Sequence, residues 1–358
     1  MRKVFSIAML IVGTVIGAGF CSGREIISFF GSGVSVIVAP LCAAGIFGVC
    51  VLFLFVGAKI NERSFDKVNH ALLGKAHAVA DVFLAVNNLI VLSAMIAGFN
   101  SLCKPILSVP ILGGAAAILC AVISLRGSKG MLDFNLVIVP FIIVTITAVC
   151  LASLRTDVIN ASVGVFKLRS IPAALVYVSM NMMLASTVLT TLGELNRKQI
   201  LWGSLIAALS IGVLMALIII ALNCTGNYDA EMPILEISAG AGRWLYIALS
   251  IVTGVSIFTT MLTAVGGLCG YLRGMGGGKV FSALIVVAVG VLLSNIGFSG
   301  VVDFFYPLVG LFGIAYIFTC LRYAKRGGLL KPPRSAREHS PKERRHSRGR
   351  LRRQKVKS

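Results

Sequence analysis

Charged residues are scarce in this chain. Only 13% of the 358 residues are Asp, Glu, Lys or Arg, against about 25% in typical soluble proteins. Hydrophobic residues make up 57%, and the mean hydropathy is +0.94. A soluble globular domain is excluded, because a soluble core cannot bury so large an apolar fraction. The composition indicates an all-α polytopic membrane protein.

The chain also lacks the short motifs that mark common catalytic and metal-dependent chemistry. It contains no phosphate-binding P-loop, no HExxH zinc motif and no GxSxG nucleophile turn. Its nine cysteines are scattered, without a CxxC pair. We interpret them as small packing residues, neither a disulfide framework nor a metal site. No enzymatic activity and no cofactor are expected.

Long apolar runs, by contrast, follow one another along most of the chain. A helix needs roughly 20 apolar residues to cross a bilayer, and this requirement indicates ten crossings between residues 1 and 323. They cover approximately residues 4–30, 34–57, 79–103, 110–125, 134–154, 171–192, 200–223, 244–270, 280–297 and 302–321. The fourth is the shortest, since Gly113 and Gly114 interrupt an already brief run.

The distribution of Lys and Arg supports this count. If the amino terminus is cytoplasmic, the inner loops hold 12 basic residues and the outer loops five, before the carboxy-terminal tail is considered. Cytoplasmic loops carry such an excess in membrane proteins. We therefore expect both termini to be cytoplasmic.

The carboxy-terminal tail differs in composition from the rest of the chain. Residues 322–358 hold 15 basic and two acidic residues with almost nothing apolar, so we expect a disordered cytoplasmic tail over 324–358. Such a tail can be attracted to anionic lipids of the inner leaflet of the bilayer. Specific nucleic-acid binding is not expected, because Tyr323 is the only aromatic residue that could stack on a base.

The first hydrophobic segment is interrupted by GTVIGAGFCSGRE, from Gly13 to Glu25. Irregular backbone at membrane depth persists only where it is buried in protein or faces a polar cavity. Gly17 and Gly19 would let the chain leave helical geometry and expose amides and carbonyls to a solute or ion. A cleaved signal peptide is the alternative, but nine further hydrophobic segments follow, which favours a binding site here.

The stretch IVGTVIGAGFCSGREIISFFG resembles the first-helix signature of YkvI-like bacterial membrane proteins. These belong to the amino acid, polyamine and organocation superfamily, which has the LeuT-type fold. The resemblance implies inverted repeats of helices 1 to 5 and 6 to 10, with discontinuous helices 1 and 6. It also implies a location in the bacterial inner membrane.

In the wider fold, backbone at the break in helix 1 holds the carboxylate or polar head of the substrate. The resemblance places this role on Gly17, Ala18 and Gly19. A half-helix that begins near Ser22 and Gly23 would point its partly positive amino terminus at the break, which suits an anionic group.

The same resemblance implies a sodium site. In many members, carbonyls of helix 1 and two hydroxyls of helix 8 hold the ion, and the matching positions are Gly13, Ile16, Thr259 and Thr260. At 1.5 Å per residue these positions meet in the inner half of the membrane or near its midplane, and oxygen ligands suit a hard cation. The alternative is that both threonines bond the preceding turn of their own helix or join neighbouring helices through hydrogen bonds. Phe134 to Leu154 contains no Lys to replace the ion, which favours Na⁺ over H⁺.

Arg24 and Glu25 are costly in hydrocarbon and, being adjacent on a helix, point about 100° apart. Asp303 is expected at the same depth as Arg24, and relatives close their outer vestibule with an Arg near helix 1 and an Asp on helix 10. We expect Arg24 and Asp303 to form this gate. The alternative is that both extend into the headgroup region. Glu25 receives no role.

Segment six departs from the expected pattern, because it offers no Gly or Pro between Pro172 and Gly193. Unwinding around Asn181 would nevertheless make Asn181 a substrate contact. The alternative is that Ser179, Asn181 and Ser186 join helices through hydrogen bonds.

These observations together indicate a secondary active transporter. It would move a small amine-bearing or zwitterionic solute, an amino acid or a relative, coupled to a cation by alternating access. The competing function is an amino-acid-sensing receptor subunit of the germinant-receptor type, without net transport.

Overall fold

The computed structural model describes residues 2–62, 65–105, 109–126, 131–154 and 164–326. The basic tail is therefore outside the described residues from position 327. The first half of the chain forms α1 (Arg2–Val15), α2 (Ala18–Ser22), α3 (Arg24–Phe30), α4 (Val38–Ile60), α5 (Phe65–Leu73), the short 3₁₀ helix η1 (Gly74–Ala76), α6 (His77–Cys103), α7 (Leu112–Arg126) and α8 (Met131–Ala152). The second half forms α10 (Ser170–Leu189), α11 (Arg197–Thr225), α12 (Pro233–Ala241), α13 (Arg243–Gly274), α14 (Lys279–Ser294) and α15 (Phe298–Arg326).

Each of the ten predicted segments coincides with helix in the described part of the chain. Six spans there are long and apolar enough to cross a membrane, namely α4, the Phe65–Cys103 stretch, α10, α11, α13 and α15. Three shorter apolar helices, Leu112–Leu125, Ile138–Ala152 and Lys279–Ser294, correspond to the fourth, fifth and ninth segments. The all-α polytopic architecture is thus confirmed.

The first segment is interrupted twice. After α1 the backbone leaves helical geometry at Ile16 and Gly17, and α2 then runs for only five residues. Gly23 follows with φ +78° and separates α2 from α3. The predicted discontinuity of helix 1 is therefore present, and it divides the segment into three short helices.

The sixth segment differs from the expectation. Within α10, all of which the structure describes, the helix is continuous through Asn181, so the interruption expected there is absent. The Asn181 side-chain amide donates to the Tyr177 carbonyl one turn earlier, at 3.1 Å. This stretch contains no Gly or Pro that would interrupt the helix, and the Asn181 side chain bonds back to its own helix.

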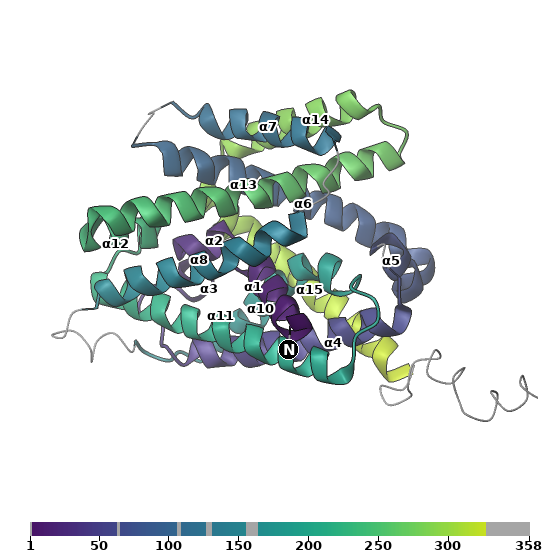
Figure 1. The fold of residues 1–358 in the computed structure, drawn as a ribbon, viewed down its shortest axis with the longest axis horizontal. Helices are drawn as coiled ribbons and strands as arrows, with labels where there is room; N and C mark the ends of the chain where they lie inside the picture. Colours follow the sequence, from purple (N-terminus) through teal and green to yellow (C-terminus); the bar gives the residue numbers. More distant parts are fainter. Residues whose placement is uncertain (1, 63–64, 106–108, 127–130, 155–163, 327–358) are drawn as a thin grey trace, which may run out of the picture.

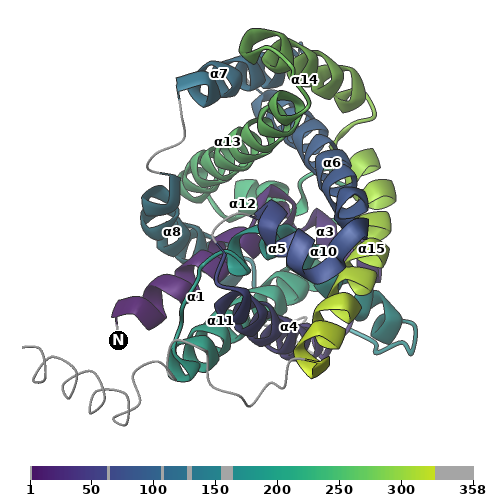
Figure 2. The same cartoon turned by 90° about the vertical axis from the view of Figure 1, so that its right-hand side faces the viewer.

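The helices form two groups. In Figures 1 and 2, α6, α7, α13 and α14 pack on one another on one side of the molecule, whereas α1, α4, α10 and α11 pack on the other. α8 contacts α1, α11 and α13, and α15 contacts α6 and α10, so these two helices bridge the groups. The short helices α2 and α3 connect the groups as well, because α2 packs on α13 and α3 packs on α10 and α15.

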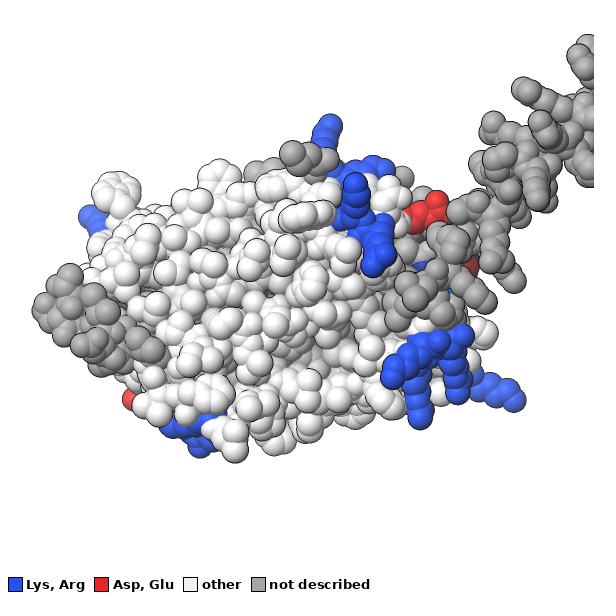
Figure 3. Space-filling view, turned by 90° about the horizontal axis from the view of Figure 1, so that it is seen from below, with Lys and Arg blue, Asp and Glu red and all other residues white. Residues whose placement is uncertain are grey.

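The outer surface suits a lipid environment. Figure 3 shows a broad face without charged side chains across its middle, and Lys and Arg gather toward the ends, most of them at one end. Large apolar side chains on outward helices are exposed, for example Phe141 and Val144 of α8 and Leu284 and Leu292 of α14. In water such a continuous apolar surface would cause aggregation, whereas lipid covers it at no cost.

Candidate functional site

A cavity of approximately 390 Å³ lies between the two helix groups. Its walls come from both sides of the α1–α2 break and from α6, α8, α10, α13 and α15. The polar part of the lining is mostly uncharged and includes Asn87, Asn181, Ser256, Thr259 and Tyr306. The predicted break therefore faces a partly polar cavity, as membrane-depth irregular backbone requires.

The three glycines around the break have different roles. Gly17 is extended, with φ −89° and ψ −173°, which any residue can adopt, and a Cβ there would meet nothing within 4 Å. Gly19 lies inside α2, where a Cβ would come within 2.1 Å of Glu25 Oε1. Only Gly23 has a left-handed conformation that favours glycine. The backbone does leave helical geometry at Gly17, as expected, and it leaves it again at Gly23. Gly19, by contrast, is helical, and its missing side chain makes space for Glu25.

The predicted substrate-head residues line the cavity through Gly17 and Gly19, and Ala18 begins α2. Two helices follow the break: α2 begins at Ala18, and α3 begins at Arg24 with Gly23 as its N-cap, so a helix does start near Ser22 and Gly23 as predicted, although α2 is the one that adjoins the break. With five residues, α2 is too short to develop a strong dipole. The argument for an anionic group at this point therefore loses its electrostatic support.

The four predicted ion-site residues line the same cavity. Gly13 and Ile16 belong to the end of the first helix and its break, and Thr259 and Thr260 lie on α13. Both threonine hydroxyls donate to the Ser256 carbonyl oxygen, at 3.0 and 2.9 Å. Each hydroxyl oxygen keeps lone pairs, so these self-bonds leave both threonines able to coordinate a cation. Ion binding by these four residues stays a prediction.

The contact predicted between Arg24 and Asp303 is present. Arg24 forms an ion pair with Asp303, and its Nε donates to Asp303 Oδ1 at 3.3 Å. A guanidinium nitrogen of Arg24 also lies 3.4 Å from the Ala230 carbonyl oxygen, just before α12. Arg24 thus links α3, α15 and the loop after α11, although its function as a gate is not tested by this contact.

Glu25, which sequence reasoning left without a role, enters the cavity wall. Its side chain is buried, with 4% exposed, whereas the neighbouring Arg24 turns toward Asp303. Among the described residues, Glu25 Oε2 has no hydrogen-bond partner. The signal was visible in the sequence as a carboxylate within the interrupted segment, but its direction depends on the turn at Gly23.

Three further polar residues of the lining were missed as site residues. Asn87 on α6 is 2% exposed, and in the described part of the chain its Oδ1 has no hydrogen-bond donor. Ser256 on α13 and Tyr306 on α15 also face the cavity. Single polar residues in apolar runs carry no distinguishing pattern, so only the packing of three distant helices reveals them.

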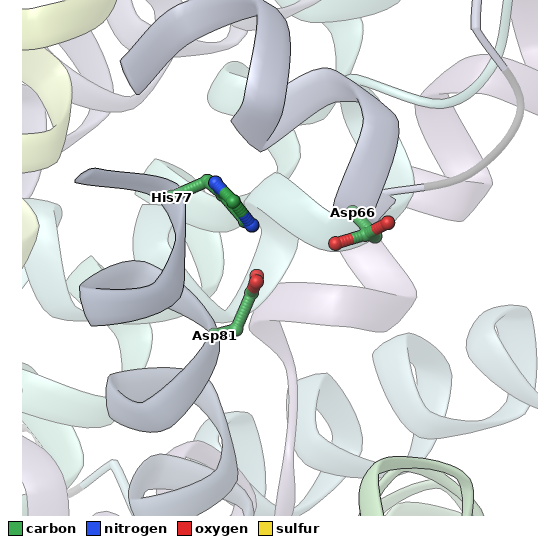
Figure 4. A group of neighbouring side chains, drawn as sticks. All are labelled: Asp66, His77 and Asp81. Carbon is green, nitrogen blue, oxygen red and sulfur yellow. The ribbon is translucent and has the colours of Figure 1, made fainter. Parts of the chain in front are cut away.

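A second group of potential ligands lies away from this cavity. Figure 4 shows His77 and Asp81 of α6 beside Asp66 of α5, with ligand atoms within 4.8 Å of one another. Asp81 accepts a hydrogen bond from the buried Asn69 at 3.1 Å, and Asn69 accepts one from Tyr316 of α15. We interpret the group as a junction that joins α5, α6 and α15.

Comparison with known sequences gives two relatives of similar length. YkvI of Bacillus subtilis (strain 168), an uncharacterized membrane protein, is 26% identical over 333 residues, which are 87% of this chain and 93% of YkvI. YyaD of the same organism is 24% identical over 326 residues, 87% of this chain and 94% of YyaD. The chain is homologous to YkvI and YyaD. No protein-family model matches it.

Comparison with solved structures shows the fold. MhsT in complex with L-phenylalanine has a TM-score of 0.67 and 16% identity, and the match covers 88% of each chain. Mhp1 in its inward-facing conformation has a TM-score of 0.60 and 13% identity, over 86% of this chain and 73% of Mhp1. A Na⁺-coupled sialic acid symporter has a TM-score of 0.57 and 10% identity, and the match covers 89% of this chain and 78% of the symporter chain. The LeuT-type fold implied by the first segment is confirmed.

Proposed function

We propose that the protein is a secondary active transporter of a small amine-bearing or zwitterionic solute, an amino acid or a close relative, coupled to a cation. The cavity carries the proposal, because the interrupted first helix and the paired threonines Thr259 and Thr260 face it together. Its volume lies within the range of about 300–1,000 Å³ that is usual for small-molecule sites. The solute would cross without chemical change.

Three observations support Na⁺ as the coupling ion. Thr259 and Thr260 offer hydroxyl oxygens, and hard cations prefer oxygen ligands. The fold is shared with a symporter described as Na⁺-coupled and with Mhp1, which is described as a nucleobase-cation-symport-1 family transporter. The fifth segment contains no Lys that could take the place of the ion. We place the protein in the bacterial inner membrane, with both termini cytoplasmic.

Transport is tested with purified protein in proteoliposomes. A panel of radiolabelled amino acids is offered under an inward Na⁺ gradient, an inward proton gradient, or neither. We expect accumulation of at least one amino acid that requires the Na⁺ gradient. Binding without accumulation, together with a need for co-expressed partner subunits, would indicate the sensor function in place of transport.

The coupling-ion site is tested with Thr259→Ala. Removal of one oxygen ligand should weaken the apparent affinity for Na⁺ by about tenfold or more, since a bond to a charged group contributes about 1.5–3 kcal/mol. The matched control is Thr319→Ala on α15, whose exposed hydroxyl donates to its own helix outside the cavity. Unchanged sodium dependence of uptake and of thermal stability in Thr259→Ala would reject the assignment.

A further inference from the structure

Glu25 is a buried acid that belongs neither to the proposed ion site nor to the proposed outer gate. Its carboxyl lines the cavity, and its side chain is 4% exposed. Among the described residues, no donor reaches its Oε2 atom. An unpaired buried carboxyl is costly in an apolar interior, so its presence requires an explanation.

The neighbouring helix leaves space for this carboxyl. A Cβ at Gly19 would lie 2.1 Å from Glu25 Oε1 and 2.7 Å from the carboxyl carbon. Gly19 itself lies within the helical turn of α2, so its backbone does not require glycine. The missing side chain therefore accommodates Glu25. The absence of a side chain at Gly19 thus matches the position of the Glu25 carboxyl, and we take this fit as a sign that the carboxyl has a function at this place.

The cavity offers no positive charge to this acid. Among the described residues that line it, none is Lys, Arg or His. Arg24, the nearest base along the chain, is engaged by Asp303 and faces away. The hydroxyl of Tyr306 and the amide of Asn181 face the cavity, but such groups cannot neutralise a carboxylate. When Glu25 is ionised, the compensating positive charge therefore has to enter the cavity with a ligand.

We propose that Glu25 binds the positively charged amine of the transported solute, and that Gly19 maintains the space in which its carboxyl lies. This assignment rests on the proposed transport function and narrows its solute class, because an acid without an amine would meet only repulsion at Glu25. It also places the amine of a zwitterion beside Gly19, where the resemblance alone had placed a carboxylate.

The first experiment measures which part of the solute is recognised. Binding of the standard amino acids, ethanolamine and putrescine to the purified protein is measured by isothermal titration calorimetry in Na⁺ at constant pH. For the amino acid that binds most tightly, the decarboxylated amine and the deaminated acid are then compared. We expect the amine to bind and the deaminated acid to bind at least about tenfold more weakly than the amino acid.

The second experiment uses Glu25→Gln, which keeps the shape of the side chain and removes its charge. Affinity for the amine-bearing ligand should fall by about ten- to hundredfold, while the Na⁺-dependent thermal shift remains. The matched control is Glu236→Gln, the same change at an exposed position of α12, which should bind as the wild type does.

Gly19→Ala tests the same site without changing the charge. The added methyl group would force the Glu25 carboxyl from its position, so affinity should fall as in Glu25→Gln. Gly48→Ala in α4 is the control, since a Cβ there meets nothing within 4 Å. Gel filtration and thermal melting of each variant separate a binding defect from a folding defect.

The outcomes distinguish this proposal from the proposed function. Wild-type affinity in Glu25→Gln, or equal affinity for the deaminated acid, would overturn the assignment of Glu25 and leave Na⁺-coupled uptake intact. Normal amine binding with a loss of proton-dependent uptake would instead assign Glu25 as a proton carrier. Amine binding that depends on Glu25 without any uptake would retain the site and reject transport. If no compound in the panel binds, the solute class and the role of Glu25 both fail.

Discussion

At the scale of single residues, the interrupted first helix shows how similar glycines have different functions. Gly17 opens toward the cavity without any steric need for glycine, Gly19 makes room for Glu25, and Gly23 turns the chain. The turn at Gly23 also sets the directions of Arg24 and Glu25, one toward Asp303 and one into the cavity. The location of the break could be predicted from the sequence, but these separate roles could not.

Gly23→Ala should lower the stability of the protein more than Gly48→Ala, which adds the same methyl group. A left-handed conformation costs a residue with a Cβ about 1–2 kcal/mol, and this Cβ would lie 2.9 Å from Ile234 Cγ1 of α12. We expect a melting temperature several degrees below that of the wild type in detergent. Gly48→Ala is the control, and equal melting temperatures of the two variants would contradict the prediction.

At the scale of helices, α10 and α15 approach each other through small residues. A Cβ at Gly310 would lie 2.4 Å from the Val176 carbonyl oxygen, and one at Gly313 would lie 2.4 Å from that of Ser179. The Ser179 hydroxyl donates to the Gly310 carbonyl at 2.7 Å. Close contacts of this kind associate helices in membranes, where the hydrophobic effect gives no drive for association.

Gly313→Ala should therefore separate α10 and α15. The methyl group has backbone atoms of α10 as its nearest neighbours, and these cannot rotate away as a side chain can. We expect lower thermal stability and a smaller fraction of monodisperse protein in fluorescence-detected gel filtration. Gly270→Ala in α13, where a Cβ would meet nothing within 4 Å, serves as the comparison. A Gly313→Ala protein as stable as this comparison would show that the two helices tolerate separation.

The helices themselves follow largely from hydropathy and charge. Ten apolar segments could be predicted because hydrocarbon requires each crossing to be long and apolar. The short helices α5 and α12 were not predicted, since they lie between the apolar runs and carry no crossing signal. The break expected at Asn181 was wrong because it came from the resemblance, whereas the local sequence contains no residue that interrupts a helix.

At the scale of the whole molecule, the Arg24–Asp303 pair joins the interrupted first segment to the last helix, 279 positions away in sequence. Arg24 also contacts the loop before α12, so three regions meet at one guanidinium. In a protein that works by alternating access, a contact of this kind would have to open and close in each cycle.

The gate is tested by exchanging its charges. Asp303→Arg should strongly reduce uptake, because it places two positive charges next to each other. The double variant Arg24→Asp with Asp303→Arg should restore part of the uptake. Restoration should be incomplete, since the exchanged acid cannot donate to the Ala230 carbonyl. Glu62→Lys at the exposed Glu62–Lys67 pair is the control and should transport normally. If the double variant restores no uptake, Arg24 and Asp303 do not act as a pair.

The sequence by itself determined that this is a membrane protein, which stretches form its apolar helices, and that the first of these stretches is interrupted. These properties follow from local constraints, namely the length of apolar runs, the position of charges and the cost of irregular backbone in lipid. Only the tertiary structure decided that Asn87, Asn181, Thr259 and Glu25 share one cavity and that α10 is continuous. The reason is that the direction of a side chain between helices depends on rotation and packing, which sequence spacing does not specify.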